Sequence, residues 1–520
     1  MKTLRVGGLA TELCLPDGPG PHPAVLIRTP YDRRRHRAEL RAWATRGFAA
    51  VAQDVRGRHA STGTWHPYRS EAADGAAALA WIRAQEWSDG RVVAVGASYA
   101  AHCALAPLLD SDTSRLTAPE TAAAITPAEH AGGGSGRARA EAPRGPDAVI
   151  VVVPALGAGE VAREETGPER LLGRAGWWLA HGDRSDSDEG ALRRALAEAP
   201  GLLDRLPVER LLALPSWPGV WAARRDPDRV RRAASARVPL LAVGGSRDPF
   251  AAETIHLWRS WGGPARLVLG PWGHGLTAEP APEARPEHRL DLGDLYARWA
   301  RAALAGTLTG RRGALALGGS AHWCAAHAES PHPLPYRFGD PAGLRLVQGA
   351  DFVADPLRPV RSDRLDIDEN AAPPDRCLLL SPPLPRPLDL FGNAEARLVA
   401  AARTSSADWA VRLIALRPDG RAEPLATGIV RTAHDSAAPR ESTVPLGFIG
   451  RRLPAGVRLR VEVAGHHFPA HARNPHTGED PVTATRLLPS RRTVRMTGSA
   501  LLLPVVHRPA HIDPVQETLR

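Results

Sequence analysis

A serine follows a short apolar run in the stretch RVVAVGASYA (91–100), and a serine in such a place can act as a nucleophile. At a tight strand-to-helix turn the nucleophile has a strained backbone, so the residues two positions before and after it must be small. Gly96 and Ala100 meet this requirement around Ser98. A serine that only caps the next helix would look the same, because serine is a favoured helix N-cap. The motif alone leaves both interpretations open, so the choice depends on its partners.

An acid and a histidine follow Ser98 in the order that an esterase-type triad requires. Such triads run serine, acid, histidine, with the later residues in loops at the ends of strands. Asp248 follows VPLLAVGG (238–245), and His274 follows ARLVLG (265–270). Taken alone, Asp248 could be a turn or cap residue and His274 a surface-loop residue. Together and in this order, the three residues predict nucleophilic catalysis.

The elements that must position these residues alternate between strands and helices. The apolar runs PAVLIRTPY (23–31) and GFAAVAQDV (47–55) predict buried strands, and EAADGAAALAWIRAQEW (71–87) predicts a helix. Continuous apolar strands alternating with helices predict a parallel α/β sheet covered on both faces. Ligands bind at the carboxyl edge of such a sheet, where all three candidate residues would lie.

Changes of composition divide the rest of the chain. Pro-rich turns between regularly spaced short strands predict a β-sandwich in the last part, and the polar middle of the chain predicts a helical region. We expect an α/β core over 1–157 and 236–310, a helical cap over 158–235, a β-sandwich over 311–520, and a flexible insertion of about 111–146 within the first part of the core.

Charge and composition exclude several classes of protein. The net charge is +10, but the basic residues are almost all arginine and are interleaved with Asp and Glu, which predicts no nucleic-acid-binding face. No apolar run is long enough for a membrane span, and the first residues lack the apolar stretch of a secretory signal. The four cysteines are widely spaced, which predicts reduced thiols in a cytoplasmic protein. Neither metal-ligand spacings nor a nucleotide-binding loop occur, so we expect no metal and no cofactor.

Several motifs together resemble one group of enzymes. They are PYDRR (30–34), QDVRGRHASTGTW (53–65), GASYA (96–100), GGSRDPF (244–250), GPWGHG (270–275) and FPAHARNPHTGEDP (468–481). With them the sequence resembles, nearly end to end, the cocaine-esterase/Xaa-Pro dipeptidyl-peptidase group of serine hydrolases (CocE/NonD and S15-type enzymes). The resemblance implies an α/β-hydrolase core with an inserted helical cap and a C-terminal β-jelly-roll domain. It also implies a small-molecule ester, amide or peptide substrate, cleaved through an acyl-enzyme.

The resemblance also assigns roles to individual residues. It makes Ser98 the nucleophile, His274 the general base and acid, and Asp248 the group that orients the histidine. The backbone N–H of Tyr99 and the hydroxyl of Tyr31 become the donors of the oxyanion hole. From the residues alone, Tyr31 reads as an aromatic at a strand end that packs against the core.

Further expectations concern the cap and one loop of the core. We expect the cap to shape the substrate pocket through its tryptophans, namely Trp177, Trp178, Trp217 and Trp221. Asp54 and Arg56 in the DVRGR loop are predicted to fix that turn through local hydrogen bonds and a salt bridge.

Three alternative functions stay open. The same triad could pass its acyl group to an amine or hydroxyl, as in an acyltransferase or cyclase. An aminopeptidase would need carboxylates for the substrate ammonium, which Glu160, Glu164, Glu165 or the stretch 182–190 could supply. A carbohydrate-binding protein with an inactive hydrolase domain is opposed by the intact triad. The sequence leaves the oligomeric state open, a homo-oligomer included.

Overall fold

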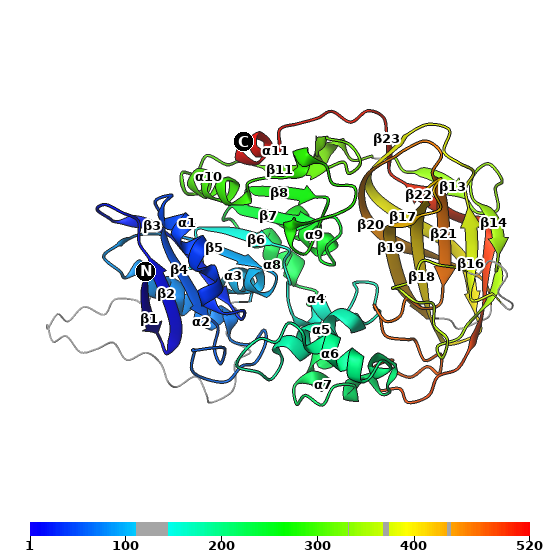
Figure 1. Ribbon diagram of the computed structural model, residues 1–520, viewed down its shortest axis with the longest axis horizontal. Coiled ribbons are helices and arrows are strands. Elements are labelled where there is room, and N and C mark those ends of the chain that lie inside the picture. Colours follow the sequence, from blue (N-terminus) through cyan, green and yellow to red (C-terminus); the bar gives the residue numbers. More distant parts are fainter. Residues whose placement is uncertain (111–143, 331, 368–373, 434–437) are drawn as a thin grey trace.

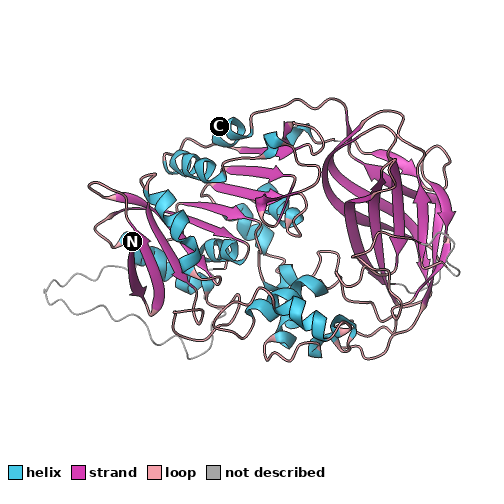
Figure 2. Ribbon diagram, in the orientation of Figure 1, coloured by secondary structure: helices cyan, strands magenta, loops and turns pink. Residues whose placement is uncertain are grey.

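The computed structural model describes residues 1–110, 144–330, 332–367, 374–433 and 438–520. The predicted flexible insertion lies outside the described residues except for 144–146. Figure 1 shows an α/β part built on a large sheet, a group of helices below its edge, and a β-sandwich beside both. Figure 2, coloured by secondary structure, shows the strands gathered in the central sheet and in the sandwich, with helices around the sheet and in the group below it.

The central sheet has ten strands in the order β1-β2-β4-β3-β5-β6-β7-β8-β11-β12. Their bounds are β1 Lys2–Val6, β2 Leu9–Cys14, β3 His22–Thr29, β4 Ala49–Asp54, β5 Ser88–Ala97, β6 Ala148–Val152, β7 Leu240–Gly245, β8 Ala265–Gly270, β11 Arg311–Ala316 and β12 Trp323–Ala325. The strands from β4 to β11 in this order pair in parallel, and the outer strands pair antiparallel. Parallel pairing brings the carboxyl ends of β5, β6, β7 and β8 to one edge, as the sequence predicts.

Helices cover both faces of this sheet, because successive side chains of each strand point to opposite faces. On one face α1, α10 and α11 pack against Val93 and Val95, and on the other α2, α3 and α9 pack against the face that includes Val92 and Ala94. The bounds are η1 Arg33–His36, α1 Arg37–Ala44, α2 Glu71–Arg83, α3 Tyr99–Leu109, α9 Ala251–Ser260, η6 Pro286–His288, α10 Leu292–Leu304 and α11 Pro514–Leu519, with a short hairpin of β9 Trp272–Gly273 and β10 Leu276–Pro280.

The helical cap leaves the sheet after β6 and returns to it at β7. Its elements are α4 Ala158–Ala162, α5 Leu171–His181, α6 Ala191–Glu198, η4 Leu202–Asp204, η5 Val208–Arg210, α7 Trp217–Ala222 and α8 Arg229–Ser235. The cap has an apolar cluster of its own, which Leu171, Trp178 and Trp217 share with Phe468 of the C-terminal part. The cap therefore packs on the sandwich as well as on the sheet.

The C-terminal part is a jelly-roll-like sandwich of two antiparallel sheets. One sheet runs β13-β22-β17-β20, with β15 and β23 paired to β22 and β17, and the other runs β14-β16-β21-β18-β19. The bounds are η7 Ala326–Ala328, β13 Leu334–Arg337, β14 Arg345–Gln348, β15 Asp351–Ala354, β16 Arg376–Leu380, β17 Leu388–Ala402, β18 Ser406–Leu416, β19 Ala422–Ala433, β20 Arg440–Leu453, β21 Arg458–Ala464, β22 Ser490–Leu503 and β23 Val505–Val506. Alternate residues such as Leu459, Val461 and Val463 fill the space between the sheets.

The chain returns to the α/β part after the sandwich. Helix α11 contacts β11, β8 and α10, and Val515 and Leu519 pack against the cluster on that face of the sheet. The Arg266 guanidinium also donates to the carbonyl oxygen of Arg520 at 2.5 Å. Figure 1 shows this end of the chain beside α10, away from the sandwich strands that precede it.

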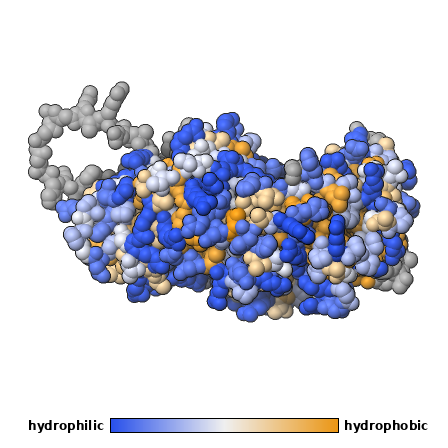
Figure 3. All heavy atoms as spheres, turned by 90° about the horizontal axis from the view of Figure 1, so that it is seen from above, coloured by the Kyte–Doolittle hydropathy of each residue, from blue (hydrophilic) through white to orange (hydrophobic). Residues whose placement is uncertain are grey.

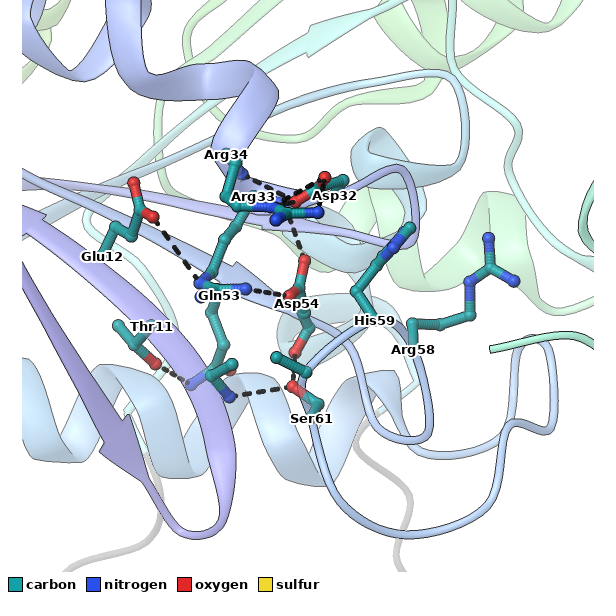
Figure 4. A network of polar contacts seen from close by, with 12 residues as sticks. Thr11, Glu12, Asp32, Arg33, Arg34, Gln53, Asp54, Arg58, His59 and Ser61 are labelled. Carbon is teal, nitrogen blue, oxygen red and sulfur yellow. Dashed lines mark hydrogen bonds and ion pairs between the residues drawn. The ribbon is translucent and has the colours of Figure 1, made fainter. Parts of the chain in front are cut away.

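The basic cluster near residue 33 is neutralised by neighbouring carboxylates (Figure 4). Arg33 forms an ion pair with Asp54 at 2.6 Å, and Arg37 forms one with Glu12 at 2.7 Å. Asp54 therefore fixes its loop through Arg33, which is distant in sequence, and Arg56 pairs with Asp74. The two loop residues are structural, but their ion pairs are not with each other.

The outer surface carries no continuous apolar face in the view of Figure 3, where apolar patches are broken up by hydrophilic side chains. Among the residues that the structure describes, no helix combines the length and the apolar character that a bilayer crossing requires.

Candidate active site

Ser98 lies at the sharp turn between β5 and α3. Its backbone has φ 57° and ψ −120°, a strained conformation for a residue with a side chain. A Cβ on Gly96 would lie 2.0 Å from the carbonyl oxygen of Ala100, so only glycine fits there. The Ser98 N–H donates to the carbonyl of Val152 at 2.9 Å, which ties the turn to the end of β6. The small residues in the motif are thus required by close backbone approach, and the turn presents the serine at the sheet edge.

Asp248 and His274 come from the next two strands and meet at this edge. Asp248 follows β7, His274 follows β8, and His274 Nδ1 lies 2.5 Å from Asp248 Oδ2. The Asp248 carboxylate is fully buried and also accepts the N–H of Phe250 at 2.7 Å. This fixed carboxylate orients the imidazole and leaves Nε2 as the nitrogen that can accept a proton.

Close backbone contact holds the two loops together. A Cβ on Gly245 would lie 2.1 Å from the carbonyl oxygen of Trp272, so the glycine at the end of β7 lets the β8 loop approach. The ring of Phe250 packs edge-on against the imidazole of His274, with centroids 5.8 Å apart. The His274 side chain is 44% exposed and so remains accessible to a substrate.

Tyr31 meets the serine from the end of β3. Its hydroxyl donates to Ser98 Oγ at 3.4 Å and accepts the indole N–H of Trp177 at 3.2 Å. The serine oxygen is the acceptor of the Tyr31 bond, and among the described residues no hydrogen bond joins Ser98 to His274. Burial raises the pKa of Tyr31, although hydrogen bonds with Ser98, Trp177 and the Tyr99 amide favour its ionised form. The phenol is therefore neutral, and its hydroxyl is a hydrogen-bond donor beside the nucleophile.

Tyr99 contributes its backbone and keeps its side chain in the core. It is the first residue of α3, where N–H groups have no partner within the helix. Its buried hydroxyl donates to Glu71 at 2.5 Å and accepts the N–H of Tyr68 at 2.6 Å. The amide of Tyr99, the residue after Ser98, also hydrogen-bonds the Tyr31 hydroxyl.

One of the four cap tryptophans lies at this site. Trp177 stacks on Tyr99 with centroids 5.6 Å apart and 13° between the rings. The structure places Trp178, Trp217 and Trp221 inside the cap's own apolar cluster, away from the serine. The Trp217 indole N–H donates to the carbonyl of Val208 at 2.8 Å. These three tryptophans hold the cap together, because its short helices need large apolar side chains to form a core.

The cap carboxylates considered for ammonium binding mostly have partners within the protein. Glu164 pairs with Arg170 at 2.7 Å and His471 at 2.9 Å, and these contacts hold its pKa below the usual range although burial opposes them. Glu160 pairs with Arg229, and Asp188 of the stretch 182–190 pairs with Arg194. The exposed carboxylates in this group are Glu165 and, in the stretch 182–190, Asp183, Asp186 and Glu189.

Two residues at the site have no signal in the catalytic motifs. The Tyr68 ring lies 4.6 Å from that of Tyr99, and it also packs near Trp177. Arg174 is buried on α5 beside Tyr68 and Tyr31. The sequence signal for Arg174 is its place as a charged residue within the mostly apolar helix LLGRAGWWLAH.

The described residues contain no group of three or more His, Cys, Asp or Glu side chains arranged to hold a metal ion.

Comparison with known proteins gives consistent matches along the chain. Residues 8–276 match the model of the X-Pro dipeptidyl-peptidase (S15) family, and residues 326–501 match the X-Pro dipeptidyl-peptidase C-terminal non-catalytic domain. A cocaine esterase from Rhodococcus sp. (strain MB1 Bresler) is 27% identical over 560 aligned positions, which cover 90% of this chain and 90% of the esterase.

Solved structures share the whole architecture. An aminopeptidase from a marine sediment Thaumarchaeota archaeon superposes with a TM-score of 0.69 at 18% identity, over 96% of this chain and 94% of the other. An α-amino acid ester hydrolase gives 0.68 at 17% identity, over 97% and 96%. A CocE/NonD family hydrolase from Staphylococcus aureus gives 0.58 at 14% identity, over 96% and 91%. At these identities the likeness shows the common fold.

Proposed function

This chain belongs to the X-Pro dipeptidyl-peptidase (S15) family of serine hydrolases, and from that premise we propose that it cleaves carboxylic esters through an acyl-enzyme on Ser98. The cocaine esterase that is 27% identical over 90% of both chains acts on an ester, which supports an ester as substrate. The carboxylates that could bind a substrate ammonium are mostly engaged with arginine and histidine, which disfavours an aminopeptidase.

The reaction begins with attack by Ser98 on the ester carbonyl. As its oxygen bonds to the carbonyl carbon, the hydroxyl proton passes to His274 Nε2, and the Asp248 carboxylate stabilises the resulting imidazolium. The Ser98 oxygen accepts the Tyr31 O–H, so the proton of the serine itself remains available for His274 Nε2. The histidine then protonates the departing alcohol, and a water molecule attacks the acyl-enzyme by the same route in reverse.

Negative charge develops on the carbonyl oxygen in both tetrahedral intermediates. The Tyr31 hydroxyl and the Tyr99 N–H are the donors that we assign to this charge. Neutral, preorganised donors stabilise the charge when it appears and need no rearrangement at that moment.

The observation that carries the proposal is that the ends of four strands, β3, β5, β7 and β8, lie at one edge of the parallel sheet. A strained serine, a histidine held 2.5 Å from a buried carboxylate, and a tyrosine hydroxyl 3.4 Å from the serine oxygen come from separate loops. A serine that merely capped α3 would not need these neighbours, and its side chain makes no capping hydrogen bond.

The test is covalent labelling. Treatment with a fluorophosphonate should add one adduct to the intact mass, and the adduct should be absent in Ser98→Ala. Ser246→Ala, in the loop that carries Asp248, is the matched control and should label like the wild type. Labelling that persists in Ser98→Ala would overturn the assignment of the nucleophile.

A further inference from the structure

Arg174 is a buried cation without a counter-ion. It lies in α5 with 7% of its surface exposed, and among the described residues no carboxylate forms an ion pair with it. Its Nε atom is buried and has no hydrogen-bond partner. Arg170, one turn earlier on the same helix, has both Glu164 and Glu253 as partners. The Tyr68 hydroxyl hydrogen-bonds Arg174, so what this position lacks, in contrast to Arg170 on the same helix, is a carboxylate partner.

The guanidinium faces the reaction centre. Residues 174, 177 and 181 lie on one face of α5, because positions three and four apart are neighbours on a helix. From this face Trp177 donates to the Tyr31 hydroxyl, and the ring of His181 packs 5.1 Å from that of Tyr31. The polar neighbours of Arg174 are the phenols of Tyr68 and Tyr31, and the second of these touches Ser98.

Neither phenol can serve as the missing anion. Burial raises the pKa of both Tyr68 and Tyr31, so both stay neutral around pH 7. Burial also lowers the pKa of Arg174 itself. An ionised side chain removed from water costs several kcal/mol unless it is paired, and such a cost persists at positions where it serves function.

We propose that Arg174 binds a carboxylate of the substrate, so that the enzyme prefers esters carrying a free carboxylate near the scissile bond. The planar guanidinium can donate two parallel hydrogen bonds to a carboxylate, which fits a single arginine without further cations. The inference rests on the proposed esterase function and adds the substrate class to it. Arg174 would determine specificity while the triad carries out the chemistry.

The test compares substrates that differ only in charge. Mono-4-nitrophenyl esters of succinate, glutarate and adipate are each measured beside the same compound with its free carboxylate methylated. A second pair, 4-carboxyphenyl butyrate and its methyl ester, places the carboxylate on the leaving group. In at least one pair the wild type should turn over the free acid about ten- to a hundredfold faster in kcat/KM than the methyl ester, the range that one or two charge-assisted hydrogen bonds provide.

Substitution then assigns the preference to Arg174. In Arg174→Met the ratio of kcat/KM for the free acid to that for the methyl ester should fall to about one or below. Arg174→Lys should keep part of the preference, because lysine retains the charge but cannot donate two parallel hydrogen bonds. Arg193→Gln removes one charge from an exposed position of the cap and should leave the ratio unchanged. Arg174→Met should also melt no lower than the wild type, since it replaces an unpaired buried charge by an apolar side chain.

Two results would overturn the proposal. One is a wild-type enzyme that shows no preference for the free acid in any pair, and the other is a preference that Arg174→Met leaves intact. Turnover of the methyl esters and fluorophosphonate labelling of Ser98 report on the esterase function itself. Failure of that function is therefore distinguishable from failure of the carboxylate site.

Discussion

Two arginines, one at the junction between cap and sandwich and one beside the reaction centre, have contrasting partners. Arg431, in β19 of the sandwich, is held by Glu169 of the cap at 2.9 Å and Asp408 of β18 at 2.7 Å. Burial opposes its charge, but these two carboxylates raise its pKa. Arg174, beside the reaction centre, has no carboxylate, and burial lowers its pKa. The junction between cap and sandwich thus satisfies its charges internally, whereas the site leaves hydrogen-bonding capacity unused.

This difference separates what each region contributes. The paired groups at the junction fix how the cap sits on the sandwich, and their loss should appear as lost stability. The groups at the site are arranged around Ser98, so substitutions that keep their size should appear as lost turnover with little change in folding. Substitutions in the two regions test this separation.

The largest effect is expected from Asp248→Asn at the site. The amide keeps the size of the side chain but no longer holds the imidazole in the tautomer that accepts the serine proton. In Ser-His-Asp enzymes this change lowers kcat by about 10⁴-fold. The kcat on 4-nitrophenyl butyrate and the melting temperature are the measurements. A variant within tenfold of the wild type in kcat would show that Asp248 does not orient His274.

A loss of stability is expected from Asp408→Ala at the junction. The substitution removes the carboxylate that Arg431 and Asn474 share, and leaves a buried cation with only Glu169. The free energy of unfolding should fall by about 3–5 kcal/mol, while kcat of the folded protein stays near normal. Asp419→Ala, which removes an exposed pair with Arg421 in the same sandwich, is the control and should unfold like the wild type. Equal stability of the two variants would contradict a structural role for the junction.

Tyr31→Phe should lower kcat by about 10²–10³-fold with KM nearly unchanged. It removes one donor to the oxyanion, and that hydrogen bond matters mainly in the transition state. The ring still packs, so the melting temperature should change little. Tyr336→Phe in β13 is the matched control and should keep full activity. A Tyr31→Phe enzyme within threefold of the wild type would make Tyr31 a packing residue and require another oxyanion donor.

The smallest expected effect is the loss of stability at acidic pH caused by His476 of the sandwich. Burial, together with the charge of Arg492, lowers the pKa of His476 to about 4. Arg492 donates to His476 Nε2 at 2.8 Å, so this ring must be neutral in the folded protein. Because the unfolded chain binds the proton near pH 6.5, stability is lost as the pH falls from about 6.5 towards 4, by roughly 1.4 kcal/mol per pH unit for this group.

His476→Gln tests that dependence. Glutamine offers Arg492 an acceptor but does not titrate, so urea unfolding at pH 7, 6 and 5 should give a shallower loss of stability than the wild type. Parallel losses in the two proteins would mean that His476 does not contribute to acid sensitivity.

The sequence predicts those parts of the site that depend on local rules. Small residues around Ser98 and the positions of Asp248 and His274 after apolar strands follow from backbone geometry and chain order. Tyr31 differs, because the residues alone favour a packing role and only the resemblance points to its hydroxyl. The order of strands β4-β3-β5 and the match to an S15 model agree with the predicted α/β-hydrolase class.

Other parts depend on contacts between segments that are distant in sequence. Nothing local distinguishes Trp177, which hydrogen-bonds the Tyr31 hydroxyl, from Trp178, which packs in the cap core one residue later. Likewise, Asp54 finds Arg33 instead of its neighbour Arg56 only once β3 and β4 lie side by side. That Arg174 has no carboxylate partner depends on all the residues packed around it, so only the three-dimensional structure shows it.

Because the chain returns to the α/β part at α11, the sandwich is inserted between two elements of that part. Both of its ends are anchored on the hydrolase sheet, through β12 on one side and α11 on the other. A domain held at two points loses most of the swinging freedom that one linker would allow, so the sandwich stays at a high effective concentration against the cap. Removing the last few residues would remove the contact between α11 and the hydrolase sheet. The sandwich would then be attached to the sheet at one point, and its contact with the cap would weaken as a result.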